Sequence, residues 1–187
     1  MFISLFDACV LYPAPVRDLV IGLAVADLYH AKWTNQIHDE WIYNLLTKRP
    51  DLKAERLEKT RQLINSSVED CLVEEYEVLI KTLELPDNGD CHILAAAIKG
   101  KAQIIVTYNL KDFPSEILNK FDIEAQHPDD FFLNQSDLHQ GAFLATIKKI
   151  RQSLKNPSKT PEGYLEVLRK NSLLKTANFL ENYIDLI

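Results

Sequence analysis

Oxygen-bearing side chains stand where short apolar segments meet turns, far enough apart in sequence to belong to separate structural elements. The positions are Asp7, Glu40, Asp87, Asp90, Asn109 and Asp112. Carboxylates that lie close together repel each other, so they require a cation, a shared proton or wide separation. Oxygen ligands without a matching set of Cys or His favour magnesium or manganese over zinc. Such an ion, together with bound phosphate, suits hydrolysis by metal-activated water.

Each of these residues also has a simpler structural explanation. Asp7 alone is an ordinary acid at the end of a strand. Asp87 and Asp90 could cap the following helix and complement its dipole. Glu40 could be a solvated residue of an amphipathic helix, and Asp112 a turn residue. The chemistry therefore depends on whether the fold brings these side chains together.

Two apolar segments are predicted to form buried parallel strands. Phe2–Phe6 stops at Asp7, and Ile104–Val106 precedes the turn that contains Asn109. Residues Asp122–Gln126 are expected to form a third strand at the edge of the sheet. Strands that alternate with helices indicate a small parallel sheet flanked by helices, so the predicted fold class is α/β.

The crevice beyond the carboxyl ends of the strands is where an open parallel sheet binds ligands. Asp7 and Asn109 should open onto this crevice, and Asp90 should face it from the head of the next helix. His92 follows Asp90 by two residues and is expected to be packed or to cap the helix rather than to contact substrate.

Helices are expected between and after the strands. In the first part of the chain they cover Val16–His30, Asn35–Thr47 with Thr34 as N-cap, about Pro50–Asn65, Glu75–Leu83 and the run to Ile98 that Gly100 stops. After Pro128 only helices are expected, at Asp129–Asn134, Leu138–Leu154, Pro161–Lys170 and Leu173–Asn182. We therefore expect an α/β domain over residues 1–130 and an all-helical extension over residues 131–187.

The composition is typical of a globular intracellular protein. Hydrophobic residues make up 47% of the 187 residues, which is ample for a core and argues against disorder. The three cysteines lack metal-type spacing and fit a reducing cytosol better than a disulfide framework. The longest wholly apolar run, Leu19–Ala26, is far too short to span a bilayer, and no basic leader precedes it. We expect a cytoplasmic protein without a membrane partner.

The net charge of −6 is distributed unevenly along the chain. Residues 140–175 contain eight Lys or Arg and two Glu, a local charge of +6, and a milder basic stretch runs from Lys48 to Arg61. Segregated charge can steer a polyanion or an acidic protein, although ordinary solvated helix faces explain it equally well. The bases nearest to the acidic motifs in the sequence are Arg17, Lys48, Arg49 and Lys111.

Four sequence motifs together resemble the PIN domain, and specifically the VapC-type ribonuclease toxins. The motifs are Phe6–Leu11, Trp33-Thr34 leading to Glu40, Leu85–Ile98 and Ile105–Pro114. Their order and spacing span residues 1 to about 130, and the two later motifs are the more specific. The resemblance implies a compact α/β fold with a quartet of mostly acidic residues that hold magnesium or manganese for RNA hydrolysis.

The resemblance also implies roles for individual residues. Catalytic roles fall to Asp7, Glu40, Asp90 and Asp112, and metal binding to Asp7, Asp90, Asn109 and Asp112. Asp87 and Thr107 are expected to support them, Thr107 through its hydroxyl. The sequence departs from the family pattern at Asn109, which stands where many relatives have an acid, and Asp112 supplies a carboxylate three residues later. The fourth ligand therefore stays open between these two residues.

The helical tail is similar to the extension in one branch of VapC-like proteins, through Thr160–Leu165 and Leu173–Ala177. It could contact RNA, cover an apolar face of the first domain or bind a partner. The resemblance implies an RNA substrate, a cognate antitoxin protein and a possible homodimer.

Two other functions are compatible with the sequence. One is an interaction module that keeps the fold and lacks turnover, which the amide at Asn109 favours. The other is a phosphatase with Asp7 as nucleophile. The phosphatase is disfavoured because Cys9 stands where the common Asp-x-Asp arrangement has its second acid.

Overall fold

A computed structural model describes residues 1–187 and contains one sheet of four short strands. The strands are β1 (Ile3–Phe6), β2 (His30–Lys32), β3 (Ile104–Val106) and β4 (Glu124–Gln126). They are all parallel, in the order β2-β1-β3-β4. The strand β1 is paired on both sides and β4 lies at an edge, as predicted. The α/β fold class is therefore confirmed.

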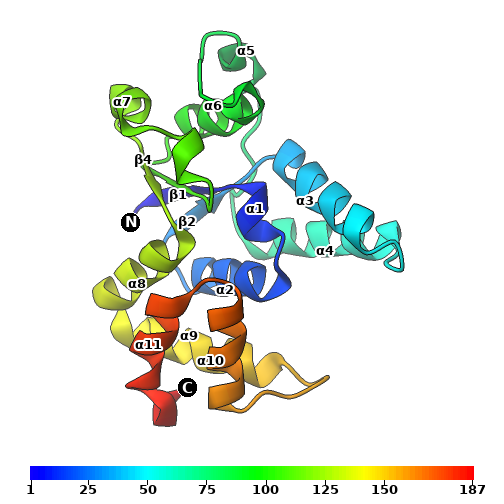
Figure 1. The fold of residues 1–187 in the computed structure, drawn as a ribbon, viewed down its shortest axis with the longest axis vertical. Helices are drawn as coiled ribbons and strands as arrows, with labels where there is room; N and C mark the ends of the chain where they lie inside the picture. Colours follow the sequence, from blue (N-terminus) through cyan, green and yellow to red (C-terminus); the bar gives the residue numbers. More distant parts are fainter.

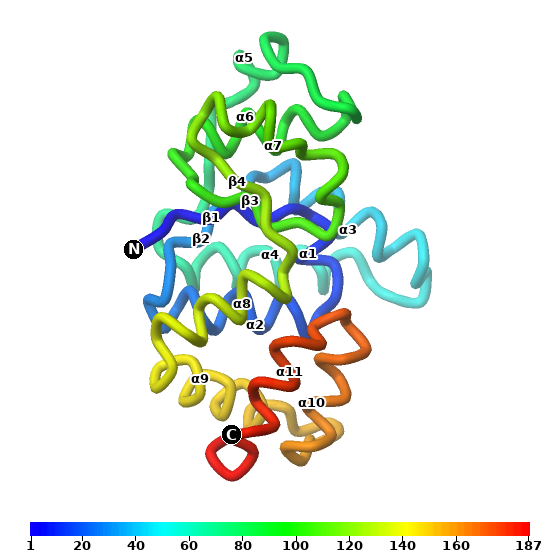
Figure 2. Tube along the Cα trace, turned by 60° about the vertical axis from the view of Figure 1, so that its left-hand side comes forward, coloured from blue at the N-terminus to red at the C-terminus, as the bar shows by residue number.

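Helices cover both faces of this sheet (Figure 1). Those in the first part of the chain are α1 (Ala8–Leu11), α2 (Ala14–Val25), α3 (Asn35–Lys48), α4 (Ala54–Ser67), α5 (Glu77–Ile80), α6 (Cys91–Lys99) and α7 (Ser115–Leu118). The C-terminal helices are α8 (Pro128–Leu138), α9 (Gln140–Ser153), α10 (Pro161–Lys170) and α11 (Leu174–Glu181). Figures 1 and 2 both show α6 on one side of the sheet and α2 with α9 on the other.

Several helix ends follow from local sequence chemistry. The hydroxyl of Thr34 accepts a hydrogen bond from the Ile37 amide at 3.1 Å and begins α3, as predicted. Thr160 caps α10 in the same way through the Gly163 amide at 3.1 Å. Gly100 ends α6 where a Cβ atom would approach the Val73 side chain to 2.9 Å.

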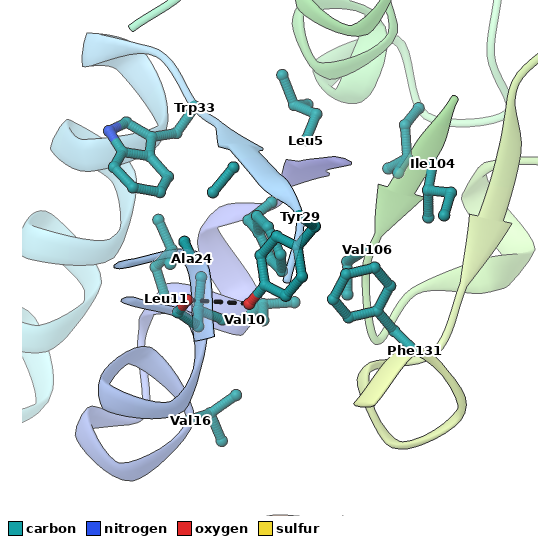
Figure 3. Packing of buried hydrophobic residues seen from close by; sticks show 14 of the residues in the cluster. Leu5, Val10, Leu11, Val16, Ala24, Tyr29, Trp33, Ile104, Val106 and Phe131 are labelled. Carbon is teal, nitrogen blue, oxygen red and sulfur yellow. Dashed lines mark hydrogen bonds between the residues drawn. The ribbon is translucent and has the colours of Figure 1, made fainter. Parts of the chain in front are cut away.

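The C-terminal helices and the sheet share one apolar core. The rings of Phe6 and Phe131 lie 5.5 Å apart, and those of Tyr29 and Phe131 lie 4.9 Å apart in an edge-to-face contact. Figure 3 shows Phe131 beside Tyr29 and Val106. Buried residues from both parts of the chain form a single contiguous cluster. The division of the chain at residue 130 stays a prediction.

Four expectations about elements were wrong in part. The helix expected to reach His30 ends at Val25, and β2 follows it. Asp27 has a left-handed backbone (φ 56°), and the His30 amide donates to the Phe2 carbonyl at 2.9 Å, a strand contact that local periodicity does not encode. The charged helix α4 begins at Ala54 rather than Pro50, α5 is shorter than expected, and α8 extends to Leu138. No helix is both long enough and apolar enough to span a membrane.

Candidate active site

The carboxylate of Asp7 is buried at the end of β1 and fixed by two side chains. Its Oδ2 atom accepts hydrogen bonds from the Thr107 hydroxyl at 2.7 Å and from the Cys9 thiol at 3.1 Å. The in-register pairing of Phe6 with Val106 brings these segments together, because each next residue leaves the sheet at the same edge. Thr107 thus contacts the first acid directly.

The turn after β3 is organised around the same atoms. The amide of Asn109 donates to the Thr107 hydroxyl at 3.0 Å, and the amide of Tyr108 lies 3.4 Å from the Cys9 sulfur. Burial, followed by the charge of Asp7, raises the pKa of the Cys9 thiol to about 12. Cys9 therefore stays protonated and acts as a hydrogen-bond donor to Asp7 rather than as a nucleophile.

The two acids before α6 have different environments. Asp87 accepts a hydrogen bond from the Gly89 amide at 2.8 Å, so it does cap a short turn. Asp90 stands at the N-cap of α6 but makes no capping hydrogen bond. Partial burial, then the negative charges of Asp7, Asp87 and Asp112, raise the pKa of Asp90 to about 6. Asp90 therefore senses an acidic field that no Lys or Arg neutralises.

Glu40 reaches this region from α3 through a histidine. The Nε2 atom of His92 lies 2.9 Å from Oε1 of Glu40, and the side-chain amide of Gln36 donates to the same oxygen at 3.2 Å. The His92 side chain is buried, as expected, while its Nδ1 atom has no partner. Because His92 is two residues after Asp90, this contact holds Glu40 against the head of α6.

The two candidates for the fourth ligand, Asp112 and Asn109, differ in burial. Asp112 is half-buried and its charge acts on Asp90. The Asn109 side chain is exposed, and only its backbone amide takes part in the network around Asp7. Asp7, Asp87 and Asp112 are thus each within electrostatic range of Asp90. No three His, Cys, Asp or Glu side chains are close enough to hold one metal ion.

The bases near the motifs are not equally available to a ligand. Arg17 is buried, donates to the Leu11 carbonyl at 2.7 Å and lies over the Trp41 ring at 4.5 Å. It therefore stabilises the end of α1, and its guanidinium is less accessible to a ligand than an exposed base. Lys111 is exposed, and the Lys48 ammonium lies 5.1 Å from the Tyr12 ring centroid.

Sequence reasoning missed two supporting contacts of the acids. The first is the thiol of Cys9 on Asp7, for which the only local signal was a polarisable side chain two residues after the acid. The second is His92 on Glu40. Nothing in the sequence connects these two residues, because the contact depends on how α3 lies against α6.

Comparison with known families agrees with this geometry. A family model described as PIN domain matches residues 4–111, more than half of the chain. The chain belongs to the PIN-domain family. A second family model, the VapC50 C-terminal domain, matches residues 128–182.

A curated relative gives the same picture for part of the chain. A segment of 79 residues is 44% identical to a protein of Mycobacterium tuberculosis (strain ATCC 25618 / H37Rv) described as "Putative ribonuclease VapC50". The matched segment covers 42% of this chain and 47% of that protein, or about half of its length. No solved structure matches the chain. Beyond its PIN domain, the chain is thus similar to a VapC protein over part of its length.

Proposed function

We propose that this protein is a metal-dependent endoribonuclease and the toxin component of a type II toxin–antitoxin module. The observation that carries the proposal is the uncompensated acidic cluster of Asp7, Asp90 and Asp112 beyond the carboxyl ends of the strands. Membership of the PIN-domain family and the description of the curated relative as a ribonuclease support it.

The donor chemistry of the cluster fits a hard divalent cation. Its carboxylate and amide groups all offer oxygen ligands, and neither Lys nor Arg is among the charges that shift the pKa of Asp90. Such donors favour magnesium or manganese. We propose Asp7, Asp90 and Asp112 as ligands, with Asn109 as the weaker candidate. Binding of one ion by three of them requires these side chains to move closer together than they lie in this structure. When bound, the cation supplies Lewis acidity and offsets the negative charge at the reacting phosphate.

The protein's own side chains orient the reaction. Thr107 and Cys9 fix Asp7 through its Oδ2 atom. His92 holds Glu40 by one carboxylate oxygen, which leaves the other to orient or deprotonate the attacking water. Attack of water on phosphorus releases the 3′ oxygen and leaves a 5′-phosphate and a 3′-hydroxyl. The ribose 2′-hydroxyl takes no part.

The experiment is an RNA cleavage assay with the full chain. Structured RNA is incubated with magnesium, with manganese and with EDTA, beside the variants Asp7→Asn and Asp90→Asn. We expect cleavage with either ion and loss of cleavage with EDTA or either substitution. Cleavage that survives chelation and both substitutions contradicts the proposal.

An interaction module without turnover is the second candidate. It is favoured by the absence of any three side chains close enough to hold one ion, and by the amide at Asn109. It predicts weak magnesium binding by calorimetry, and partner affinity that Asp90→Asn leaves unchanged. Under either function we propose a cognate antitoxin and RNA as partners. The three free thiols fit a reducing compartment such as the cytoplasm.

A further inference from the structure

Tyr108 connects the acidic site to the C-terminal helices. It lies between Thr107 and Asn109, the two residues that bond to each other beside Asp7. Its amide donates to the Cys9 sulfur at 3.4 Å. Its hydroxyl donates to the backbone carbonyl of Asn171 at 3.0 Å. One residue therefore touches the ligand network with its backbone and the extension with its side chain.

The Tyr108 side chain is held along its whole length. Its ring meets the His127 ring edge-to-face, with the centroids 5.0 Å apart and the planes at 81°. Burial raises the pKa of Tyr108, so the hydroxyl stays protonated and remains a donor. The hydroxyl has one hydrogen-bond partner in the protein, the Asn171 carbonyl.

The acceptor belongs to a fixed part of the extension. Asn171 is the C-cap of α10, and its side chain donates to the Val167 carbonyl at 2.8 Å. The next helix, α11, is tied to α8 by Asp129, whose buried carboxylate accepts the amides of Lys175 and Thr176, each at 2.8 Å. Figure 1 shows the α10–α11 connection at the end of these helices nearer to the sheet.

We propose that the C-terminal helices position the acidic site through Tyr108. The bond from Tyr108 to Asn171 fixes the turn at residues 107–109, and this turn orients Asp7 through the Thr107 hydroxyl and the Cys9 thiol. Tyr108 is then a positioning residue for RNA hydrolysis, an assignment that rests on the proposed function. The extension then contributes to catalysis through the contact between Asn171 and Tyr108.

The test compares two variants of the full chain. Tyr108→Phe removes the hydroxyl and keeps the ring on His127. Tyr164→Phe is the matched control, because Tyr164 is equally a tyrosine, is 1% exposed and has a hydroxyl without a partner. Two quantities are measured: kcat and KM on structured RNA with magnesium, and amide hydrogen exchange in metal-free protein.

We expect Tyr108→Phe to lower kcat about 10-fold with KM unchanged, the lower end of the range for groups that orient metal ligands. The amides of Tyr108 and Asn109 should exchange faster, while those of α6 keep their wild-type rates. The control variant Tyr164→Phe should behave like the wild type. Unchanged kcat, or unchanged exchange at residues 108–109, overturns the proposal.

Two further outcomes are separable. Faster exchange throughout α6 and α10 with a lower melting temperature indicates general destabilisation and also overturns the proposal. If the wild type itself cleaves no RNA, the proposed function fails. Exchange at residues 108–109 then decides by itself whether Tyr108 anchors the turn.

Discussion

The two ends of the parallel sheet both carry acidic side chains, but with opposite electrostatic surroundings. At the amino ends of the strands a cleft of about 480 Å³ is lined by Asp27, Glu69 and Asp70 together with His30, Lys32 and Lys101. There the Lys32 ammonium lies 2.8 Å from Asp70 and lowers the pKa of that acid. At the carboxyl ends, Asp90 has only other acids around it apart from His92, and its pKa is raised to about 6.

The contrast shows that residue type alone does not identify a functional acid. Asp70 and Asp90 are both aspartates in connections to or from a helix, and the sequence around Asp70 is no less charged. What separates them is burial and the charge of the neighbours: Asp70 is exposed and paired with Lys32, whereas Asp90 is partly buried among other acids. The cleft beside Asp70 lies at the end of the sheet away from the proposed ligands.

The largest expected effect separates the two ends directly. Asp7→Asn and Asp90→Asn should each lower RNA cleavage by more than about 100-fold, because they remove proposed ligands and not merely the groups that orient them. Asp70→Asn, at the other end of the sheet, should stay within about 2-fold of the wild type, since exposed ion pairs contribute little. Initial rates on structured RNA measure all three. Equal losses of cleavage activity in Asp70→Asn and Asp90→Asn would contradict the functional difference between the two ends of the sheet.

A smaller loss of activity is expected when His92, which holds Glu40, is replaced. His92→Leu leaves Glu40 without its buried partner and should lower kcat roughly 10- to 100-fold, as for other groups that orient catalytic ligands. His92→Gln keeps a donor near the Nε2 position and should recover much of this loss. Rates and circular dichroism spectra of both variants test this. If both variants are folded and cleave RNA equally slowly, the hydrogen bond to Glu40 does not account for the loss of activity.

We expect the fourth ligand to be Asp112, whose charge acts on Asp90, rather than Asn109, which stands where many relatives have an acid. Asp112→Asn removes a proposed ligand whose charge acts on Asp90 and should lower activity by about 100-fold, whereas Asn109→Ala should cost less than about 3-fold. Titration of each variant with magnesium provides the measurement. A larger effect at Asn109 would return the fourth ligand to the position that the family pattern favours.

The smallest effect is on stability as the pH changes. The folded-state pKa of Asp90, about 6, lies above the ordinary value of 3.8, so folding favours its protonated form. Its contribution to stability is complete below about pH 4 and is lost as the pH rises through about 6. The melting temperature of Asp90→Asn relative to wild type should therefore rise by a few degrees between about pH 4 and about pH 7.

Thermal unfolding with EDTA measures this difference. The pH dependence of stability due to Asp70 has the opposite sign, because Lys32 lowers the pKa of this acid. The contribution of Asp70 to stability is therefore present at neutral pH and lost in acid. Relative to wild type, Asp70→Asn should thus be least stable near neutral pH. Parallel pH profiles for the two variants would contradict the assignment of opposite environments.

Local chemistry made part of the fold predictable from the sequence. The strand before Asp7, the Thr34 cap and the limits of α10 depend on neighbouring residues, and all three were correct. The strand β2 was missed because its three residues come shortly after a helix-like apolar segment. They form a strand only by pairing with β1. Short strands at the flank of a sheet are set by such pairing more than by propensity.

The sequence by itself determined the candidate side chains for the chemistry and the helix or strand that presents most of them. It could not separate Asn109 from Asp112, or show that Arg17 is buried, because those distinctions depend on neighbours that are distant along the chain. Tertiary structure decided that Thr107 holds Asp7, that His92 holds Glu40 and that Tyr108 reaches Asn171. The physical reason is range. Periodicity and capping encode contacts within one turn of a helix, whereas these bonds join residues that only strand order and helix packing bring together.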